Sequence, residues 1–392
     1  MPVGAGFIPA RIGENKKMTE HKKLQPEIRF AGFTDDWEQC KLGEFSKTTI
    51  GEFVIKTKQN PNSKYPVYNG GVSYTGFYDD FNNNGHKIIV SARGANAGFI
   101  NIINGKYWAG NSCYSIDIQS DNYCIEYVYH FMKHKQHLFT DFQQAANIPS
   151  VSKKNVEEFL ISYPRSKEEQ TQIGNFFKQL DDTIALHQRE LEKFKILKTS
   201  YLENIFLGKV SLFTAKNTIT WEQRKLGEVV NVLDNLRIPI AASQRLEGVT
   251  PYYGANGIQG YIDGFTHDGE FVLVAEDGAN DLINYPVQYV LGKVWINNHA
   301  HVLQGIKNVA NNLFLVYRIK SMDMTKYLVG GGRTKLNASV MKDIELHLPN
   351  YAEQTQIGNF FKQLDDTITL HQKELAKYQQ IKAACLEKMF VE

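Results

Sequence analysis

The chain has 392 residues, of which 42% are hydrophobic and 12% aromatic, a composition typical of ordered globular domains. This length is sufficient for two domains, each with its own hydrophobic core. The formal net charge of +2 neither favours nor excludes a nucleic-acid partner, which needs only a local basic surface. No run of 18 or more apolar residues is present, so no segment is predicted to span a membrane.

The cysteines show no CxxC or other metal-ligand spacing, so we expect free thiols in a reducing compartment and no metal site. The four cysteines are Cys40, Cys113, Cys124 and Cys385. The first residues also lack the continuous apolar stretch of a secretory signal. Both features predict a cytoplasmic protein.

A variable block over residues 25–165 follows a short N-terminal extension and consists of short apolar runs separated by glycine and asparagine turns. The runs "HKIIVSA" (residues 86–92) and "YSIDI" (residues 114–118) predict strands. Residues 124–135 and 150–159 predict helices. The block is therefore expected to be a strand-rich α/β domain.

A long helix is predicted next, over residues 166–208. Ser166 and Glu169 have the spacing of a capping box at its start. Apolar residues then recur at alternating spacings of four and three, which is the pattern of a coiled-coil seam. The seam residues are Ile173, Phe177, Leu180, Ile184, His187 and Leu191.

A second variable block over residues 209–349 also consists of short apolar runs separated by glycine and asparagine turns. Strands are predicted there at "EFVLVAE" (residues 270–276) and "NLFLVYRI" (residues 312–319). A second long helix is predicted over residues 350–392. His371 in this helix, like His187 in the first, interrupts an apolar seam. A polar residue at a core position usually fixes the register of the pair, so we expect no metal or catalytic role for either histidine. The second seam consists of Ile357, Phe361, Leu364, Ile368, His371 and Leu375.

The two halves are copies of one unit. The strings "EQTQIGNFFKQLDDTIALHQREL" and "EQTQIGNFFKQLDDTITLHQKEL", which start at Glu169 and Glu353, differ at two of 23 positions and lie 184 residues apart. The same offset aligns "WEQCKLGE" with "WEQRKLGE", but Trp108 and Trp295 align at 187, so the second copy carries a short insertion. The predicted fold is α+β: two strand-rich α/β domains joined by two long antiparallel coiled-coil helices, in a pseudo-twofold tandem repeat.

Catalytic motifs are absent from the sequence. It contains no GxxxxGK[ST] phosphate loop, no [DNS]PP[YF] tetrapeptide, no HExxH and no GxSxG. The pairs Asp181-Asp182 and Asp365-Asp366 point in different directions on a helix, so a solvated face or a contact with a partner protein fits them better than a metal site. We therefore predict a chain that is not an enzyme by itself.

This combination closely resembles the specificity subunit of type I restriction-modification enzymes. The resemblance rests on the two "WEQxKLGE" openings and above all on "EQTQIGNFFKQLDDTI", and it covers the chain from about Leu24 onward, leaving residues 1–24 as an extension. It implies that residues 25–165 and 209–349 are target-recognition domains that each read one half of an asymmetric bipartite DNA sequence. The helices over residues 166–208 and 350–392 would set the spacer between the halves.

The resemblance also implies partners and cofactors. The partners are double-stranded DNA, two methyltransferase (modification) subunits docked on the helices, and restriction (translocase-nuclease) subunits. S-adenosylmethionine, ATP and Mg²⁺ are expected in those subunits and no cofactor in this chain, the whole complex being a DNA adenine methyltransferase and ATP-dependent endonuclease. The alternative is a two-headed adaptor that binds proteins or glycans, because the architecture alone does not require DNA.

The first candidate reading loops are "SARGANAG" (residues 91–98) and "AEDGANDL" (residues 275–282), which share Gly-Ala-Asn and differ just before it. Arg93 there aligns with Asp277. An arginine can donate two hydrogen bonds to guanine, and Glu276 or Asp277 can accept from cytosine. The alternatives are an intradomain salt bridge for Arg93 and a turn-forming role for Asp277.

Two further pairs of loops complete the prediction. Residues 140–154 and 329–342 are polar segments next to a helix start, which suits phosphate and base contacts but also an ordinary surface hairpin. Residues 65–77 and 250–261 are rich in tyrosine, for which packing is the simpler role. The full set of candidate DNA-contacting residues is Lys56, Lys58, Tyr68, Ser91, Arg93, Asn96, Gln143, Gln144, Ser150, Tyr253, Glu276, Asp277, Asn280, Arg333, Thr334 and Lys335.

Overall fold

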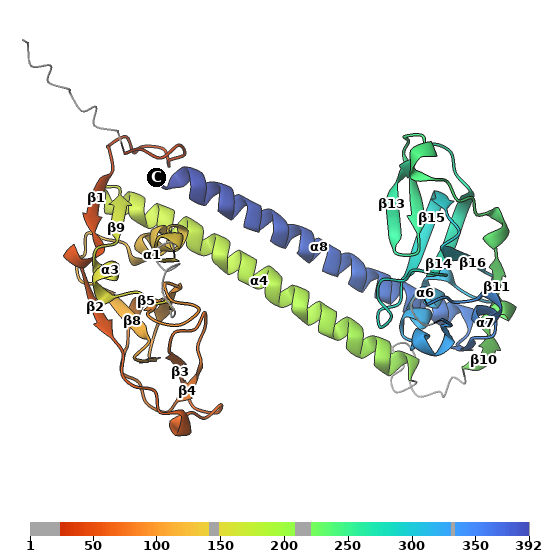
Figure 1. The fold of residues 1–392 in the computed structure, drawn as a ribbon, viewed down its shortest axis with the longest axis horizontal. Helices are drawn as coiled ribbons and strands as arrows, with labels where there is room; N and C mark the ends of the chain where they lie inside the picture. Colours follow the sequence, from red (N-terminus) through yellow and green to blue (C-terminus); the bar gives the residue numbers. More distant parts are fainter. Residues whose placement is uncertain (1–23, 141–148, 208–220, 331–333, 392) are drawn as a thin grey trace, which may run out of the picture. The chain divides into compact units, whose positions relative to one another are not determined.

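Two compact units make up the chain (Figure 1). The computed structural model describes residues 24–140, 149–207, 221–330 and 334–391. The first unit comprises Met1–Ala185 and Lys377–Glu392, and the second unit comprises Leu186–Ala376. Each unit thus holds one variable block and a part of each long helix, α4 (Lys167–Phe206) and α8 (Tyr351–Met389). Within the described residues, no helix has the length and apolar character needed to cross a membrane.

The variable block of the first unit is built on a four-stranded sheet of order β2-β8-β5-β6 and a three-stranded sheet of order β4-β3-β7. Strand β1 pairs with β9, and the named strands pair antiparallel except β3 with β7. The strands are β1 (Glu38–Lys41), β2 (Ser46–Ile50), β3 (Tyr65–Tyr68), β4 (Gly76–Tyr78), β5 (His86–Ser91), β6 (Ile100–Asn104), β7 (Trp108–Ala109), β8 (Cys113–Ile118) and β9 (Leu160–Tyr163). The helices are η1 (Leu42–Glu44), η2 (Lys56–Lys58), α1 (Ile125–His134), α2 (His137–Thr140) and α3 (Lys153–Glu157).

The second unit repeats this topology in one six-stranded sheet of order β11-β16-β14-β15-β12-β13, with β10 paired to β17. The sheet is continuous because β15 extends through Trp295, which pairs in parallel with β12 as Trp108 pairs with β3. The strands are β10 (Glu222–Lys225), β11 (Val230–Val232), β12 (Thr250–Gly254), β13 (Gly257–Ile262), β14 (His267–Ala275), β15 (Val287–Ile296), β16 (Ala300–Gly305) and β17 (Glu345–Leu348). The helices are α5 (Leu226–Val229), η4 (Asp234–Leu236), η5 (Ala242–Gln244), α6 (Asn312–Lys320), η6 (Met324–Tyr327) and α7 (Ala338–Lys342).

One predicted strand is a helix. The run "NLFLVYRI" (residues 312–319) forms α6, the counterpart of α1. The side chain of Asn311 accepts a hydrogen bond from the backbone N–H of Phe314 at 3.1 Å and so caps the helix. An apolar run buried on several sides has no helical or strand periodicity, and this led to the wrong prediction. The helix expected over residues 150–159 is also shorter, since only α3 forms there.

The nearly identical string in each half is explained by contacts inside its own unit. Gln170 accepts a hydrogen bond from the N–H of Cys124 at 3.0 Å, and Gln354 accepts one from the N–H of Asn311 at 2.9 Å. These bonds tie the starts of α4 and α8 to the starts of α1 and α6. At Gly174 an added Cβ would lie 2.8 Å from the backbone nitrogen of Tyr127, so the helices approach too closely there for any side chain.

Within each unit the two long helices pair antiparallel through aromatic rings. In the first unit Phe390, near the end of α8, stacks on Phe177 with ring centroids 5.3 Å apart. In the second unit Phe206, at the end of α4, stacks on Phe361 at 6.0 Å. Phe177 and Phe361 are completely buried. The seam residues Ile173, Leu180 and Ile357 are buried as well, and Ile184, His187, Leu191, Leu364, Ile368, His371 and Leu375 are half-buried.

The polar residues of the helices have partners across the pair. Nδ1 of His187 lies 3.0 Å from Nδ1 of His371 in the second unit. Lys198 forms an ion pair with Asp365 at 2.6 Å, and Lys382 forms the equivalent pair with Asp181 in the first unit. The first aspartate of each repeated pair is therefore an internal contact, which corrects the expectation of a solvated or partner-facing role. The second aspartate of each pair does lie on the exposed face.

The buried ion pair between Arg29 and Glu169 generates a stability prediction. Its N···O distances are 2.6 and 2.9 Å, and Glu169 is only 1% exposed. Arg29→Ala leaves the carboxylate buried without its cation, so the first unit should lose about 3–5 kcal/mol of stability. Hydrogen exchange followed by mass spectrometry resolves this loss unit by unit.

The duplication supplies a matched control. Glu353 is the counterpart of Glu169, but its buried Oε2 has no hydrogen-bond partner among the described residues. Glu353→Gln should therefore cost the second unit much less than Glu169→Gln costs the first. Equal losses in both units would contradict a specific role for the Arg29 ion pair.

Candidate nucleic-acid interface

Three predicted loops of the first unit meet at one end of its four-stranded sheet. The loop after β5 pairs with the segment before α3, since the N–H of Val151 donates to the carbonyl of Ala92 at 2.9 Å and an isolated bridge joins Arg93 to Ser150. The loop after β3 joins them through Ser91, whose hydroxyl donates to the carbonyl of Gly71 at 2.9 Å. The residues between β7 and β8 complete the cluster, because the N–H of Ala92 donates to the carbonyl of Ser112.

The second unit brings the equivalent loops together in the same way. The N–H of Leu336 donates to the carbonyl of Glu276 at 2.7 Å, and an isolated bridge joins Asp277 to Lys335. The loop after β12 contributes Asn256, whose side chain donates to the carbonyl of Gly278 at 2.9 Å. The residues between β15 and β16 join them, because the N–H of Glu276 donates to the carbonyl of His299 at 2.8 Å. Each unit therefore presents the same set of four loops at the end of its sheet, held by main-chain and side-chain hydrogen bonds.

The candidate residues of the first unit differ widely in exposure. Arg93, Asn96 and Ser150 are exposed, and within the described residues Arg93 forms no hydrogen bond or ion pair through its side chain. That placement disfavours the intradomain salt bridge considered for Arg93. Ser91 is buried, and Tyr68 is half-buried with its ring edge-on to Tyr107, which are packing roles.

Other candidates lie apart from these contacts or outside the described residues. Lys56 and Lys58 lie in η2 and are exposed. Gln143, Gln144 and Arg333 lie outside the described residues.

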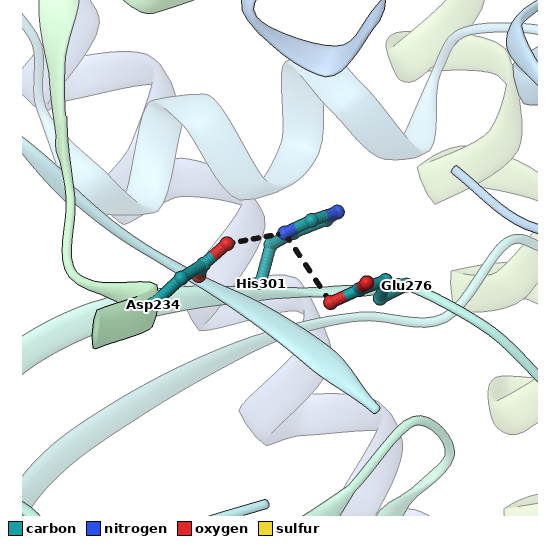
Figure 2. Close-up of side chains that lie close together, drawn as sticks. All are labelled: Asp234, Glu276 and His301. Carbon is teal, nitrogen blue, oxygen red and sulfur yellow. Dashed lines mark hydrogen bonds and ion pairs between the residues drawn. The ribbon is translucent and has the colours of Figure 1, made fainter. Parts of the chain in front are cut away.

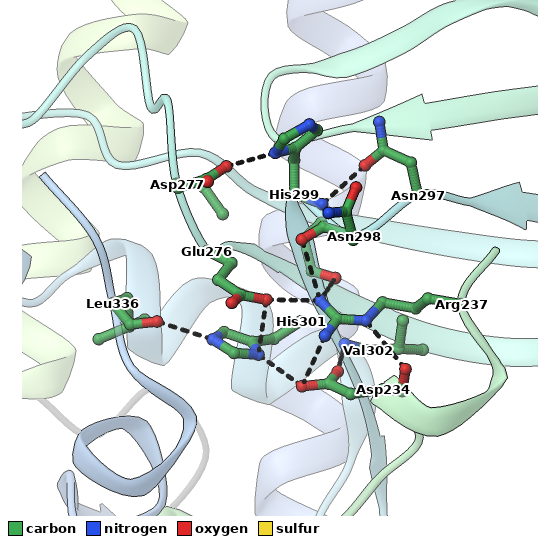
Figure 3. A network of polar contacts seen from close by, with 12 residues as sticks. Asp234, Arg237, Glu276, Asp277, Asn297, Asn298, His299, His301, Val302 and Leu336 are labelled. Atoms are coloured by element: carbon green, nitrogen blue, oxygen red, sulfur yellow. Dashed lines mark hydrogen bonds and ion pairs between the residues drawn. The ribbon is translucent and has the colours of Figure 1, made fainter. Parts of the chain in front are cut away.

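Three candidates of the second unit are engaged inside it, and Figure 3 shows the contacts of Glu276 and Asp277. Lys335 forms an ion pair with Glu276 at 2.8 Å, and Asp277 contacts Nδ1 of His299. Asn280 is exposed, Thr334 is half-buried, and Tyr253 is half-buried against the second core of the unit. Glu276 is only 13% exposed, so its carboxylate is held inside the unit rather than presented to a ligand.

A polar network behind the loops of the second unit fixes Glu276 (Figure 3). Arg237 donates to Glu276 at 2.6 Å and to the carbonyl of Ala300 at 2.8 Å. Asp234 accepts from the N–H of Val302 at 2.8 Å and from His301. The network therefore joins η4, β14 and β16 just where the reading loops leave the sheet.

His301 lies between the carboxylates of Asp234 and Glu276 (Figure 2). Nδ1 lies 2.6 Å from a carboxylate oxygen of Asp234, and Nε2 lies 2.9 Å from the carbonyl oxygen of Leu336. Both ring nitrogens therefore face an acceptor oxygen within hydrogen-bonding distance. Asp234, Glu276 and His301 hold ligand atoms within 4.8 Å of one another, as in a metal site. Because Arg237 and Lys335 already form ion pairs with these carboxylates, the arrangement fits an ion-pair network better than metal binding.

The network also sets the acidity of its carboxyl groups. Burial by itself raises the pKa of Asp234, but the hydrogen bonds from His301 and Val302 and the charge of Arg237 outweigh it and lower that pKa below its ordinary value of 3.8. Burial likewise raises the pKa of Glu276, and the hydrogen bonds from Lys335 and Arg237 lower it below 4.5. Both side chains are therefore ionised at neutral pH.

Four residues of this network were not predicted from the sequence: Asp234, Arg237, His299 and His301. None belongs to a motif, and they become neighbours only when η4 and β16 meet. The one sequence signal is the departure of the second copy from the first: at the offset that aligns the tryptophans, His301 replaces Tyr114.

The sequence model of the family described as "Type I restriction modification DNA specificity domain" matches residues 34–195 and 218–380. These matches cover more than half of the chain, so the chain belongs to this family and carries its domain twice. This confirms the family that the sequence features predicted.

Individual relatives agree with the family assignment. A protein of Haemophilus influenzae that carries the name of a type I restriction enzyme specificity subunit is 45% identical over 136 residues, which is 35% of each chain. A Mycoplasma genitalium protein named as a type I specificity subunit is 22% identical over 95% of this chain and 97% of its own.

A solved structure supports the fold. The crystal structure of the type I restriction-modification system S subunit from M. genitalium superposes with a TM-score of 0.78 at 19% identity, covering 94% of this chain and 100% of that one. The predicted α+β tandem-repeat fold is thereby confirmed.

The lowered pKa values of Asp234 and Glu276 lead to a prediction about acid stability. A carboxyl group whose pKa is lower in the folded state contributes stability above its ordinary pKa and loses it as the pH falls through the folded value. Asp234→Asn should therefore destabilise the second unit by about 3 kcal/mol at pH 7, because it leaves the buried His301 and Arg237 short of a carboxylate. Well below pH 3.8 the difference between the variant and the wild type should disappear.

Unit-resolved hydrogen exchange at pH 7 and pH 3, corrected for the intrinsic exchange rate, measures this difference. Asp323→Asn removes an exposed carboxylate of the same unit and serves as the control, with little effect expected at pH 7. If Asp234→Asn destabilises the second unit as much at pH 3 as at pH 7, the loss of stability does not come from the ionised network.

Proposed function

We propose that this protein is the sequence-specific DNA-binding subunit of a type I restriction-modification complex. Membership of the specificity-domain family supports this function. The observation that carries it is the repeated loop cluster: the same four loops meet at the end of the sheet in each unit, with different side chains at equivalent positions. A rigid scaffold with variable loops is the usual arrangement for base reading.

The two units would read different half-sites. Arg93 is exposed and without a side-chain partner among the described residues, which suits a bidentate contact with guanine. The equivalent position in the second unit is Asp277, an acceptor held by His299. An asymmetric bipartite target follows, because identical readers would instead select a palindrome.

The remaining parts of the assembly are assigned from the same family resemblance. Residues 25–165 and 209–349 would be the target-recognition domains, and the helices over 166–208 and 350–392 would set the spacer and dock two modification subunits. Restriction subunits would join this core in the cytoplasm. Methylation and ATP-dependent cleavage, with S-adenosylmethionine, ATP and Mg²⁺, would belong to the partner subunits and not to this chain.

Arg93→Ala tests the reading role directly. A base-reading arginine is worth about 1–3 kcal/mol of discrimination, so the variant should lose preference at positions of one half-site only. Selection of bound duplexes from a random-sequence pool by the full-length protein measures this change.

Controls separate base reading from general attraction. Arg165→Ala removes an exposed arginine that pairs with Glu38 and should leave the selected sequence unchanged. If Arg93→Ala weakens binding to every DNA sequence equally, Arg93 contacts a phosphate and does not read a base. Binding of the wild type that is insensitive to salt, or absent, would reject the DNA function in favour of a protein or glycan adaptor.

A further inference from the structure

A polar groove runs along α4 in the second unit, beside the reading loops. Its volume is about 590 Å³, and it lies between Lys198 and Leu202 of α4 on one side and the β14–β15 loop on the other. Asn256 and Asn280, which belong to the loop cluster, line one end of it. The groove therefore continues the candidate DNA surface from the reading loops to the helix.

The insertion that distinguishes the second copy lies in one wall of this groove. The connection between β14 and β15 comprises residues 276–286, whereas its counterpart between β5 and β6 comprises residues 92–99. The difference is three residues, 11 against 8, which accounts for the change of sequence offset from 184 to 187. Asn284 and Pro286 of the longer loop line the groove.

The equivalent lysines of the two units have different surroundings. In the first unit Lys133 donates to the carbonyl of Ile100 at 2.8 Å and to the side chain of Gln136 at 2.9 Å, and its ammonium group lies 3.6 Å from the ring centroid of Phe99. Its counterpart Lys320 lines the groove, and in the part of the chain described here it forms no hydrogen bond or ion pair. The first unit thus satisfies this lysine internally, and the second unit leaves it available.

The neighbouring charges leave the groove short of an anion. Lys198 is paired with Asp365, which also accepts a hydrogen bond from Tyr317. Asp281 accepts from the backbone N–H groups of Ile283 and Asn284 and from the side chain of Asn284. These carboxylates are already engaged, so among the described residues Lys320 forms no ion pair, and Asp365 attracts it only from a longer distance.

The acidity of Lys320 is consistent with this shortage. Although its side chain is exposed overall, surrounding protein atoms desolvate the ammonium group and lower the pKa of Lys320. The charge of Lys198 lowers it further, and Asp365 opposes these effects only in part. An anion in the groove would relieve the repulsion between the two lysines.

We propose that this groove binds a backbone phosphate of the DNA strand that flanks the half-site read by the second unit. Lys320 supplies the charge, and the amide of Gln288, which also lines the groove, supplies a neutral donor. Such a contact positions the duplex against the loop cluster and carries no base preference. Lys133 of the first unit is bonded internally and makes no such contact, so the two units would contact the DNA backbone differently. This inference rests on the proposed DNA-binding function.

The test compares Lys320→Ala and Gln288→Glu with the wild-type full-length protein on a 30-base-pair duplex of random sequence at 50–200 mM salt. Lys320→Ala should bind more weakly than the wild type, and the slope of log affinity against log salt should be shallower by about 0.9. Between 50 and 200 mM salt the variant should therefore lose roughly threefold to fourfold less affinity than the wild type loses. Gln288→Glu keeps both lysines and adds a negative charge, so it should also weaken binding. Neither variant should change the sequence selected by the reading loops.

Lys326→Ala is the matched control, since Lys326 is an exposed lysine of the same unit that does not line the groove. If both groove variants keep the wild-type affinity and salt slope while Arg93→Ala still alters one half-site, the proposed phosphate contact in the groove is wrong and the DNA-binding function stands. Binding of inorganic phosphate that depends on Lys320, without any change in duplex affinity, would also overturn it. A wild type that does not bind duplex DNA would overturn both proposals.

Discussion

The stacking of a phenylalanine from the end of each long helix on a phenylalanine near the start of the other is the contact on which the structure depends. Phe390 closes the core of the first unit over Phe177, and Phe206 closes the core of the second over Phe361. Removing such a buried ring typically costs about 3–5 kcal/mol. Because α1 and α6 pack on the same rings, the helix ends also fix the position of each variable block relative to its own helix pair.

On this common base the two units build different surfaces. In the first, Ala92 and Tyr114 stand where the second has Glu276 and His301, and the neighbouring Arg93 is exposed. In the second, Asp234, Arg237, Glu276 and His301 form a buried network that holds the loops through charge-assisted hydrogen bonds. Among the described residues, the loop after β5 thus presents an exposed arginine in the first unit, and the loop after β14 is held by a neutralised cluster in the second. That difference is what an asymmetric reader requires, since the scaffold must be constant while the loops vary.

Sequence reasoning succeeded where a repeated pattern reflects repeated packing. The heptad spacing of α4 and α8 is visible because each helix buries one stripe, and the loops after β5 and β14 are visible because glycine and asparagine mark their turns. It failed at residues 312–319, where a helix buried on several sides has lost its periodicity. It also failed at Asp181 and Asp365, because their lysine partners lie about 200 and 170 residues away in the chain, beyond any local pattern.

The duplication, the two long helices and the family can be recognised without coordinates, because they rest on identities between aligned residues and on a regular apolar spacing. Which of the differing residues face outward depends on the folded chain, since exposure is set by partners that are distant in the sequence. Glu276 and Asp277 are adjacent acidic residues in a glycine-rich loop, yet Glu276 is held inside by Arg237 and Lys335, and Asp277 is held by His299. The same holds for the groove beside them: the three inserted residues are evident in the alignment, but the position of Lys320, which has no ion-pair partner among the described residues, is known only once the loop is placed against α4.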